Sequence, residues 1–195
     1  MQEGTRWCLM AAAEGILVQH GVNALSVRKI GDAAGLNPTL VTYHFGSLHG
    51  LLDALCTSNL EPILAAWNQF GTAEGANWTL DDVLHAWLTP MFHPAKFTSG
   101  GRALVVLDEL AAHGDAALKS RVLSAMEAFA LRLREVIGPL IPHLTQDQLR
   151  ARLRFISGAV LGPPPRIRAA PLDNGCTPLD ALAYLLPFAR AALRV

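Results

Sequence analysis

The sequence predicts an all-α protein. Along most of its 195 residues, apolar side chains recur at intervals of three and four, the spacing of one face of an α-helix. No stretch shows the alternation of apolar and polar residues that is typical of a half-buried strand. Capping residues, glycines and prolines mark the helix ends. These patterns predict a three-helix head in residues 1–47 and a longer helical body in residues 48–195.

Two short helices joined by a tight turn are predicted within residues 26–45. Ser26 supplies an N-cap for the first, and Gly35 ends it, because glycine tolerates the positive φ angle of a helix C-terminus. Asn37 and Pro38 form an N-cap and first-turn pair that begins the second helix. This arrangement is typical of a helix-turn-helix, whose second helix enters the major groove of DNA.

Two glycines complete the predicted head. A helix over residues 5–20 precedes the two short ones and is ended by Gly21. Gly31 lies in the middle of the first short helix, where its small size suits a close crossing of two helices. We therefore expect the first helix to brace the two that follow.

The head resembles the DNA-binding region of the TetR family of bacterial transcriptional regulators. The resemblance covers about the first third of the chain and is carried, in family order and spacing, by Gly21, Ser26-Val27-Arg28-Lys29-Ile30, Ala33-Ala34-Gly35-Leu36, Tyr43-His44-Phe45-Gly46-Ser47 and Leu51-Leu52. It implies a cytoplasmic, homodimeric regulator of transcription. Repression is the expected sign of regulation, with release from a palindromic operator by a small apolar or amphipathic ligand.

The resemblance also implies which side chains meet DNA. Positions that approach bases in the family correspond to Arg28, Pro38, Thr39, Leu40 and Tyr43, with Asn37 at the helix start, and positions near phosphate correspond to Lys29, Thr42 and His49. Two positions depart from the family pattern. Thr42 replaces a common Tyr, and Leu48 replaces a usual Lys.

The charge of the chain gives little support to DNA binding. Sixteen Lys and Arg balance sixteen Asp and Glu, and residues 1–60 hold three cations against four anions, a net charge of −1. Phosphate contacts supply much of the affinity of DNA-binding proteins. An alternative therefore stays open: a dimeric small-molecule sensor or protein-interaction module with a weak DNA-binding head.

The body is predicted to hold further helices over residues 48–70, 79–92, 102–112, 115–137, 145–161 and 177–194. Thr79 with Asp82, and Thr145 with Gln148, have the spacing of a capping box. Pro62 is expected to kink or bend the first of these helices. Loops are expected over residues 71–78 and 162–175.

The last two helices carry apolar residues on more than one face, so each must be covered on more than one face. A second copy of the chain provides such a cover through a four-helix interface with two-fold symmetry. The mean hydropathy of +0.29, high for a soluble monomer, favours this arrangement. The resemblance implies the same interface, and the residues expected in it are Leu153, Ile156, Val160, Leu182, Leu185, Leu186 and Phe188.

Aromatic and methionine side chains are concentrated in the body. Each alone is most simply a core residue, but as a set they are consistent with an apolar pocket between helices. The resemblance implies that such a pocket binds the ligand. The expected lining is Trp67, Trp78, Trp87, Phe92, Phe97 and Met126, with His85, Asp108 and His113 as polar anchors.

No catalytic motif, metal-ligand spacing or cofactor fingerprint is present in the sequence, so neither an enzyme nor a cofactor is expected. A small helical enzyme is the second alternative, with Asp81 and His85, or Asp108, Glu109 and His113, as its groups. No apolar run is long enough to cross a bilayer. Widely separated cysteines at positions 8, 56 and 176 indicate free thiols in a reducing cytoplasm.

Overall fold

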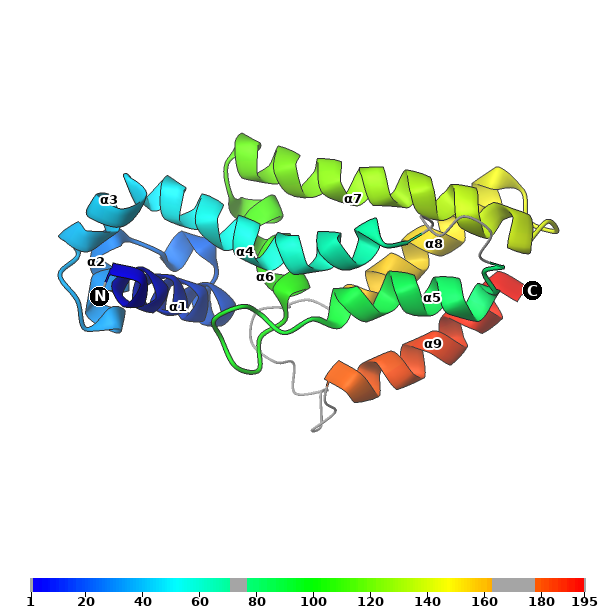
Figure 1. Ribbon diagram of the computed structural model, residues 1–195, viewed down its shortest axis with the longest axis horizontal. Coiled ribbons are helices and arrows are strands. Elements are labelled where there is room, and N and C mark those ends of the chain that lie inside the picture. Colours follow the sequence, from blue (N-terminus) through cyan, green and yellow to red (C-terminus); the bar gives the residue numbers. More distant parts are fainter. Residues whose placement is uncertain (1, 71–76, 163–177, 195) are drawn as a thin grey trace. The chain divides into compact units, whose positions relative to one another are not determined.

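The computed structural model describes residues 2–70, 77–162 and 178–194 (Figure 1). Within these ranges every regular element is a helix, and extended backbone is paired at one isolated bridge, between Pro94 and Arg102. The all-α prediction is confirmed. The expected loop over 162–175 falls almost entirely outside the described residues, as does most of the loop over 71–78.

The helices are α1 (Gln2–His20), α2 (Val27–Ala34), α3 (Thr39–Phe45), α4 (Leu48–Asn68), α5 (Leu80–Leu88), α6 (Ala103–His113), α7 (Ala116–Ile137), α8 (Gln146–Leu161) and α9 (Pro178–Arg194). Three short 3₁₀ helices connect some of them in the described ranges: η1 (Val22–Ala24), η2 (Thr89–Phe92) and η3 (Gly138–Leu140). Pro62 lies within α4, which continues on both sides of it. Both predicted capping boxes, Thr79 with Asp82 and Thr145 with Gln148, are formed.

The predicted α-helix over residues 79–92 is shorter than expected. Helix α5 ends at Leu88, and the chain tightens into the 3₁₀ helix η2. Pro90 supplies the physical reason, because it has no N–H to donate to the carbonyl four residues earlier. The side chains of Pro90, Met91 and Phe92 are nevertheless buried, as the apolar pattern requires.

The chain forms two compact units, neither of which is one continuous stretch. Unit 1 takes the described residues of Met1–Glu61 and Pro94–Leu123, and unit 2 takes those of Pro62–His93 and Ser124–Val195. Helices α4 and α7 contribute residues to both units. The domain division after residue 47 stays a prediction.

Unit 1 has an apolar core to which all of its helices contribute. Its fully buried side chains include Leu9, Leu17, Ile30, Val41, Leu51, Leu55, Leu107, Leu110 and Leu118. Burying one such side chain stabilises the fold by about 1.5–3 kcal/mol. Because α1 contributes Leu9, Ala13 and Leu17 at four-residue spacing, one face of this helix anchors the head.

Two buried carboxylates tie the segments of unit 1 together. Glu14 on α1 is fully buried, and its oxygens accept hydrogen bonds from Asn59 Nδ2 at 2.7 Å and from the backbone N–H of Phe97 at 2.7 Å. Asn59 Oδ1 in turn accepts from the Lys96 N–H at 3.1 Å. Glu109 on α6 accepts from the N–H of Val22 at 2.9 Å. These bonds fix α1 and η1 against α4, α6 and the loop that precedes α6.

Unit 2 is built around stacked aromatic rings. The indole of Trp67 lies on the ring of Phe129, with 3.9 Å between centroids and 11° between planes. Its Nε1–H donates to the carbonyl of Trp87 at 3.1 Å. Helix α5 runs beside α9 (Figure 1), and Asp81 on α5 pairs with Arg190 on α9 at 2.6 Å. Helix α8 also packs on α9, where Arg152 donates to the Ala192 carbonyl at 2.7 Å.

Candidate nucleic-acid interface

Helices α2 and α3 form the helix-turn-helix that the sequence predicts. The Ser26 hydroxyl accepts from the N–H of Lys29 at 3.2 Å and so caps α2. Gly35 ends α2 in the left-handed region, with φ of 65°. Asn37 Oδ1 accepts from both the N–H and the hydroxyl of Thr39, at 2.9 and 2.8 Å, and thereby caps the start of α3.

The close approach of α2 and α3 depends on Gly31. A Cβ atom placed on this residue would lie 2.7–2.9 Å from atoms of Pro38, including its backbone N and Cα. Real Cβ atoms do not approach other heavy atoms so closely. The predicted role of Gly31 in a close crossing is therefore confirmed, and its partner is Pro38, the residue directly before α3.

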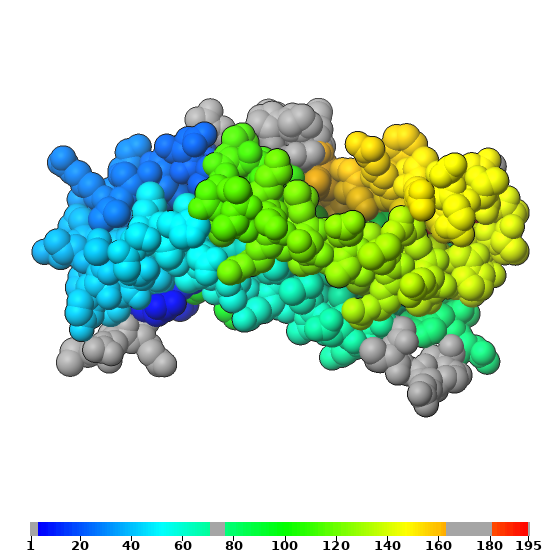
Figure 2. All heavy atoms as spheres, turned by 90° about the horizontal axis from the view of Figure 1, so that it is seen from above, coloured from blue at the N-terminus to red at the C-terminus, as the bar shows by residue number. Residues whose placement is uncertain are grey.

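Helix α3 has a buried side and an exposed polar side. Val41 is fully buried, and Leu40 is half-buried. Thr39 and Thr42 are exposed, and 72% of Tyr43 is open to solvent. Figure 2 shows side chains of this blue-to-cyan segment on the surface of the molecule. The exposed side thus offers hydroxyl groups and one aromatic ring, which suit contacts to base edges and phosphates.

The cations predicted to meet DNA differ in their surroundings. The side chain of Arg28 is 89% exposed and lies 3.8 Å from Asp32, one helical turn away. Lys29 folds back and donates from Nζ to the Ala24 carbonyl at 3.1 Å. Of these two cations of α2, Arg28 is therefore the one whose charge is directed to solvent.

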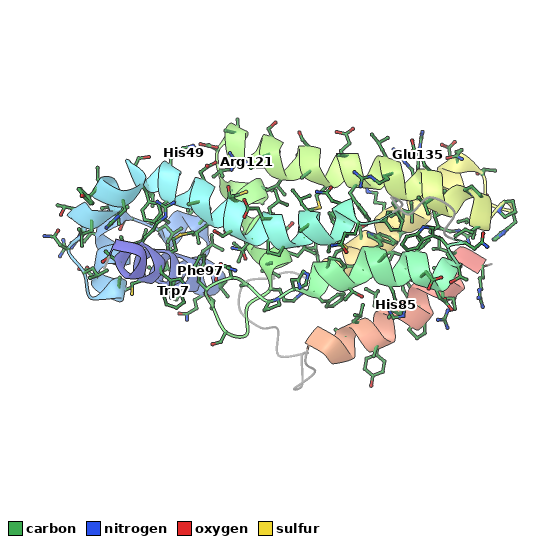
Figure 3. The ribbon with its side chains drawn as sticks, viewed as in Figure 1. Trp7, His49, His85, Phe97, Arg121 and Glu135 are labelled. Atoms are coloured by element: carbon green, nitrogen blue, oxygen red, sulfur yellow. The ribbon has the colours of Figure 1, made fainter. Side chains whose placement is uncertain are left out.

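His49, expected near phosphate, has a partner within unit 1. Its Nδ1 lies 2.6 Å from the carboxylate of Asp115, the residue that precedes α7. One turn further along α4, Asp53 pairs with Arg121 of α7 at 2.8 Å, and Arg121 also donates to Thr57 at 3.0 Å. Figure 3 labels His49 and Arg121 in this region. A line of polar contacts thus joins the first half of α4 to the start of α7.

One contact of α3 was not predicted from the sequence. Arg6 of α1 donates from Nη1 to the carbonyl of His44 at 3.1 Å, and its guanidinium carbon lies 4.4 Å from the ring centroid of Phe45. No local pattern announces a contact between residues 38 positions apart. Its one sequence signal is that Arg6 is among only three Lys and Arg in residues 1–60.

The residues predicted to line a ligand pocket fall into the two units. In unit 2, Trp67, Trp87 and Phe92 are buried, Trp78 and Met126 are half-buried, and His85 is exposed. In unit 1, Phe97 packs edge-on against Trp7 at 5.9 Å (Figure 3), and His113 lies 3.2 Å from Glu109. Asp108 of unit 1 is half-buried on α6. Their role in ligand binding stays a prediction.

The predicted dimer residues also divide. Within the single chain Leu153, Ile156, Val160, Leu182 and Leu185 are buried, so they contribute to the core of unit 2. Leu186 is half-buried, and 53% of Phe188 is exposed. The outward side of α8 and α9 instead presents Phe155 and Tyr184, at 72% and 74% exposure, together with Phe188.

In the described ranges, no three His, Cys, Asp or Glu side chains gather as a metal ion would require. Among the helices of those ranges, none is both long and apolar enough to span a membrane. Cys8 and Cys56 are free thiols, the first exposed and the second buried. Burial raises the pKa of the Cys56 thiol.

The fold and the site together define an all-α protein with an N-terminal helix-turn-helix of the kind that reads DNA. Residues 9–55 match the model of the bacterial regulatory proteins of the tetR family. The resemblance to this family is therefore confirmed for the head. No curated protein matches the chain by sequence.

Solved structures share the fold over nearly the whole chain. A protein from Rhodococcus sp. assigned to the TetR-family transcriptional regulators has 20% identity and a TM-score of 0.63, and the match covers 97% of this chain and 99% of that one. The TetR-family transcriptional regulator PfmR from Thermus thermophilus has 16% identity and a TM-score of 0.68, covering 95% and 96%. The chain thus has the fold of TetR-family transcriptional regulators.

Proposed function

We propose that this protein is a cytoplasmic, homodimeric transcriptional regulator that represses from a near-palindromic operator and is released by a small apolar or amphipathic ligand. The observation that carries the DNA-binding part is the polar exposed side of α3. It is held on a helix-turn-helix whose turn is fixed by Gly31, Gly35 and Asn37. Recognition helices read bases through such exposed residues.

The DNA contacts assigned in this proposal are those of the α2–α3 segment. Tyr43, Thr39 and Arg28 are exposed and suit base edges, and the half-buried Pro38 and Leu40 suit apolar contacts such as a thymine methyl group. Thr42 and Lys29 suit phosphate, Lys29 after release from the Ala24 carbonyl. His49 joins them only if it leaves Asp115.

The dimer part of the proposal is supported by the outward side of α8 and α9. Phe155, Tyr184 and Phe188 are large rings with more than half of their surface exposed. Exposed aromatic residues of this size mark surfaces that a partner covers. A second copy that presents the same residues would bury them across a two-fold axis.

The ligand part rests on the resemblance and on the aromatic side chains of the helical body. A bound apolar compound near Trp67, Trp78 or Trp87 would change tryptophan fluorescence. It would release DNA only by binding the released form more tightly, since equal affinity for both forms shifts nothing.

One experiment tests the DNA-binding part directly. The wild-type protein is used to select duplexes from a random-sequence library, and the selected duplex is then titrated with wild type and with Tyr43→Ala. We expect two half-sites about one helical turn, or a multiple, apart, and a loss of discrimination against random duplex in the variant. If wild type enriches no sequence, this part of the proposal is wrong.

A second candidate is favoured by the state of the cations. Arg6 and Lys29, two of three in residues 1–60, both donate to backbone carbonyls. A head so short of free charge suits a dimeric ligand sensor or protein-interaction module whose DNA binding is weak. The same selection separates the candidates, because this one predicts no enriched sequence while the dimer persists in sedimentation.

A further inference from the structure

We propose that Arg6 is a positioning residue for recognition: from α1 it fixes the C-terminal end of α3 and so sets how the reading helix is presented to DNA. The inference rests on the proposed DNA-binding function. It concerns a residue outside the helix-turn-helix, in a helix that would otherwise be regarded only as a brace.

Helix α3 needs support from outside itself. It has only seven residues, far fewer than the roughly 12–15 that an isolated helix needs to be marginally stable in water. Its start is held by the Asn37 cap and by the contact of Pro38 with Gly31. At its end the last carbonyls have no partner within the helix. Gly46 follows the last residue of α3 with a φ angle of 76°, and the Gly46 N–H donates to the Thr42 carbonyl at 2.8 Å.

Arg6 supplies what the end of α3 lacks. Its Nη1 donates to the His44 carbonyl at 3.1 Å, which satisfies one of these carbonyls. Its guanidinium lies over the ring of Phe45 at 4.4 Å from the centroid, where a cation is attracted to the ring face. A positive charge at this place also opposes the negative end of the helix dipole. One side chain thus makes three favourable interactions with the last turn.

The support is rigid because Arg6 stands on α1. Leu9, Ala13 and Leu17 of that helix are fully buried in unit 1, and Glu14 is bound on both oxygens. The orientation of α3 is therefore set at its start by α2 and at its end by α1. A helix held at only one end would pivot, and small changes of angle move the base-reading side chains out of reach of their partners.

This role differs from a phosphate contact, the usual role of an arginine in a DNA-binding head. A guanidinium committed to a carbonyl and a ring displaces no counterion from DNA. Removing Arg6 should therefore weaken DNA binding without changing its salt dependence. Loss of one phosphate contact would instead reduce the magnitude of the negative slope of log K against log salt by about one.

The test compares wild type, Arg6→Ala and a matched control, Arg150→Ala, on the duplex that wild type selects. Arg150 lies on α8 with its side chain 62% exposed, so the control removes the same charge far from the head in sequence. We expect Arg6→Ala to weaken selected-duplex binding about tenfold, random-duplex binding much less, and the salt slope not at all. A slope reduced by about one, or unchanged affinity, would overturn the proposal.

Phe45→Leu gives an independent readout, since it removes the ring and leaves Arg6 in place. We expect about threefold weaker binding to the selected duplex at an unchanged salt slope. In the double variant the two losses should not add. Full additivity of the two losses would contradict the proposal. If Arg6→Ala does not fold, the affinity and salt slope of Phe45→Leu alone provide the test, and unchanged affinity in that variant would contradict the proposal.

Amide exchange measured without DNA separates this inference from the proposed function. The Gly46 amide should exchange faster in Arg6→Ala than in wild type, while Arg150→Ala leaves it unchanged. Should wild type select no duplex, the proposed function fails, and faster Gly46 exchange would still support the structural role of Arg6. Unchanged exchange would refute that role.

Discussion

The carboxylate of Asp115 has two roles at once, one for each oxygen. One oxygen accepts from the N–H groups of Ala117 and Leu118, at 3.0 and 2.9 Å, and so caps the start of α7. The other lies 2.6 Å from Nδ1 of His49 at the start of α4. Helix α4, which follows α3, is thereby joined to the first turn of α7.

These two roles of Asp115 can be separated by substitution. Asp115→Ala removes both and should lower the free energy of unfolding by about 1 kcal/mol through the lost N-cap. Asp115→Asn keeps a side-chain oxygen for the cap but removes the charge that faces His49, so it should stay near wild type. Urea unfolding of the three proteins measures the difference. An equal loss in both variants would show that the pairing with His49, rather than the cap, provides the stability.

The contact between Gly31 and Pro38 predicts a sharp difference between two helical glycines. Gly31→Ala forces a methyl group against Pro38 and should destabilise the protein by about 1–3 kcal/mol. Gly15→Ala on α1 is the matched control, because no atom lies within 4 Å of its Cβ position. That change should be neutral or stabilise by up to about 1 kcal/mol. Thermal unfolding would contradict the argument if both alanines behaved alike.

Asp82 makes the stability of unit 2 depend on acid pH. The hydroxyl and the backbone N–H of Thr79 both donate to the carboxylate of Asp82. These two bonds, the one from the hydroxyl most strongly, lower the pKa of Asp82 below its ordinary value. Its stabilising effect is therefore fully present above the ordinary aspartate pKa of about 3.9 and is lost as the pH falls through the lowered folded value. The Tm difference between wild type and Asp82→Asn should be constant near neutrality and shrink below about pH 4. In Thr79→Ala the acid transition should move toward the ordinary range, and no such movement would refute the assigned cause.

The proposed dimer should depend on the outward rings of α8 and α9. Phe155→Glu and Phe188→Glu each place a charge in the proposed dimer interface and should weaken dimerisation at least about tenfold. Leu131→Glu is the control, since it changes an apolar side chain of similar exposure, 51%, on α7. Sedimentation velocity distinguishes monomer from dimer. A dimer that survives both ring substitutions would exclude this face.

Leu48, the residue directly after the weakly charged head, offers a gain of function. It is half-buried in the first turn of α4, directly after Ser47, whose hydroxyl accepts from the N–H of Gly50 at 3.1 Å. Leu48→Lys should raise the affinity for selected and random duplex alike and steepen the salt slope by about one. The measurement is a titration at several salt concentrations, and an unchanged slope would show that residue 48 does not face phosphate.

Local chemistry explains which parts of the fold were predictable. Ser26, Gly35 and the Thr145–Gln148 pair act on backbone groups a few residues away, so their spacing in the sequence suffices to place helix ends. The same holds for Asn37 at the start of α3. Where the expected α-helix over 79–92 failed in its last turn, Pro90 was visible in the sequence, and its missing N–H is the reason.

The remaining features depend on contacts that spacing does not encode. An apolar stripe does not reveal whether its cover is the same chain or a second copy, so Ile156 and Val160 were expected at an interface and lie in the core of unit 2. Likewise the partners of Arg6 and His49 are 38 and 66 positions away in the sequence, since 44 − 6 and 115 − 49 give these separations. Such pairs are fixed only once the helices have packed.

The bond between Glu14 and Asn59 has a consequence for how this sequence is able to change. Replacing Glu14 with leucine would leave the Phe97 N–H and a proton of the Asn59 amide without their acceptor inside the protein. Replacing Asn59 with leucine would leave a Glu14 oxygen without its donor and the N–H of Lys96 without its acceptor. Each abandoned group that stays shielded from water costs about 1–3 kcal/mol. A change at either residue alone therefore lowers the stability of the protein unless the other residue changes as well. Two positions 45 residues apart in the sequence are thus expected to change together during evolution.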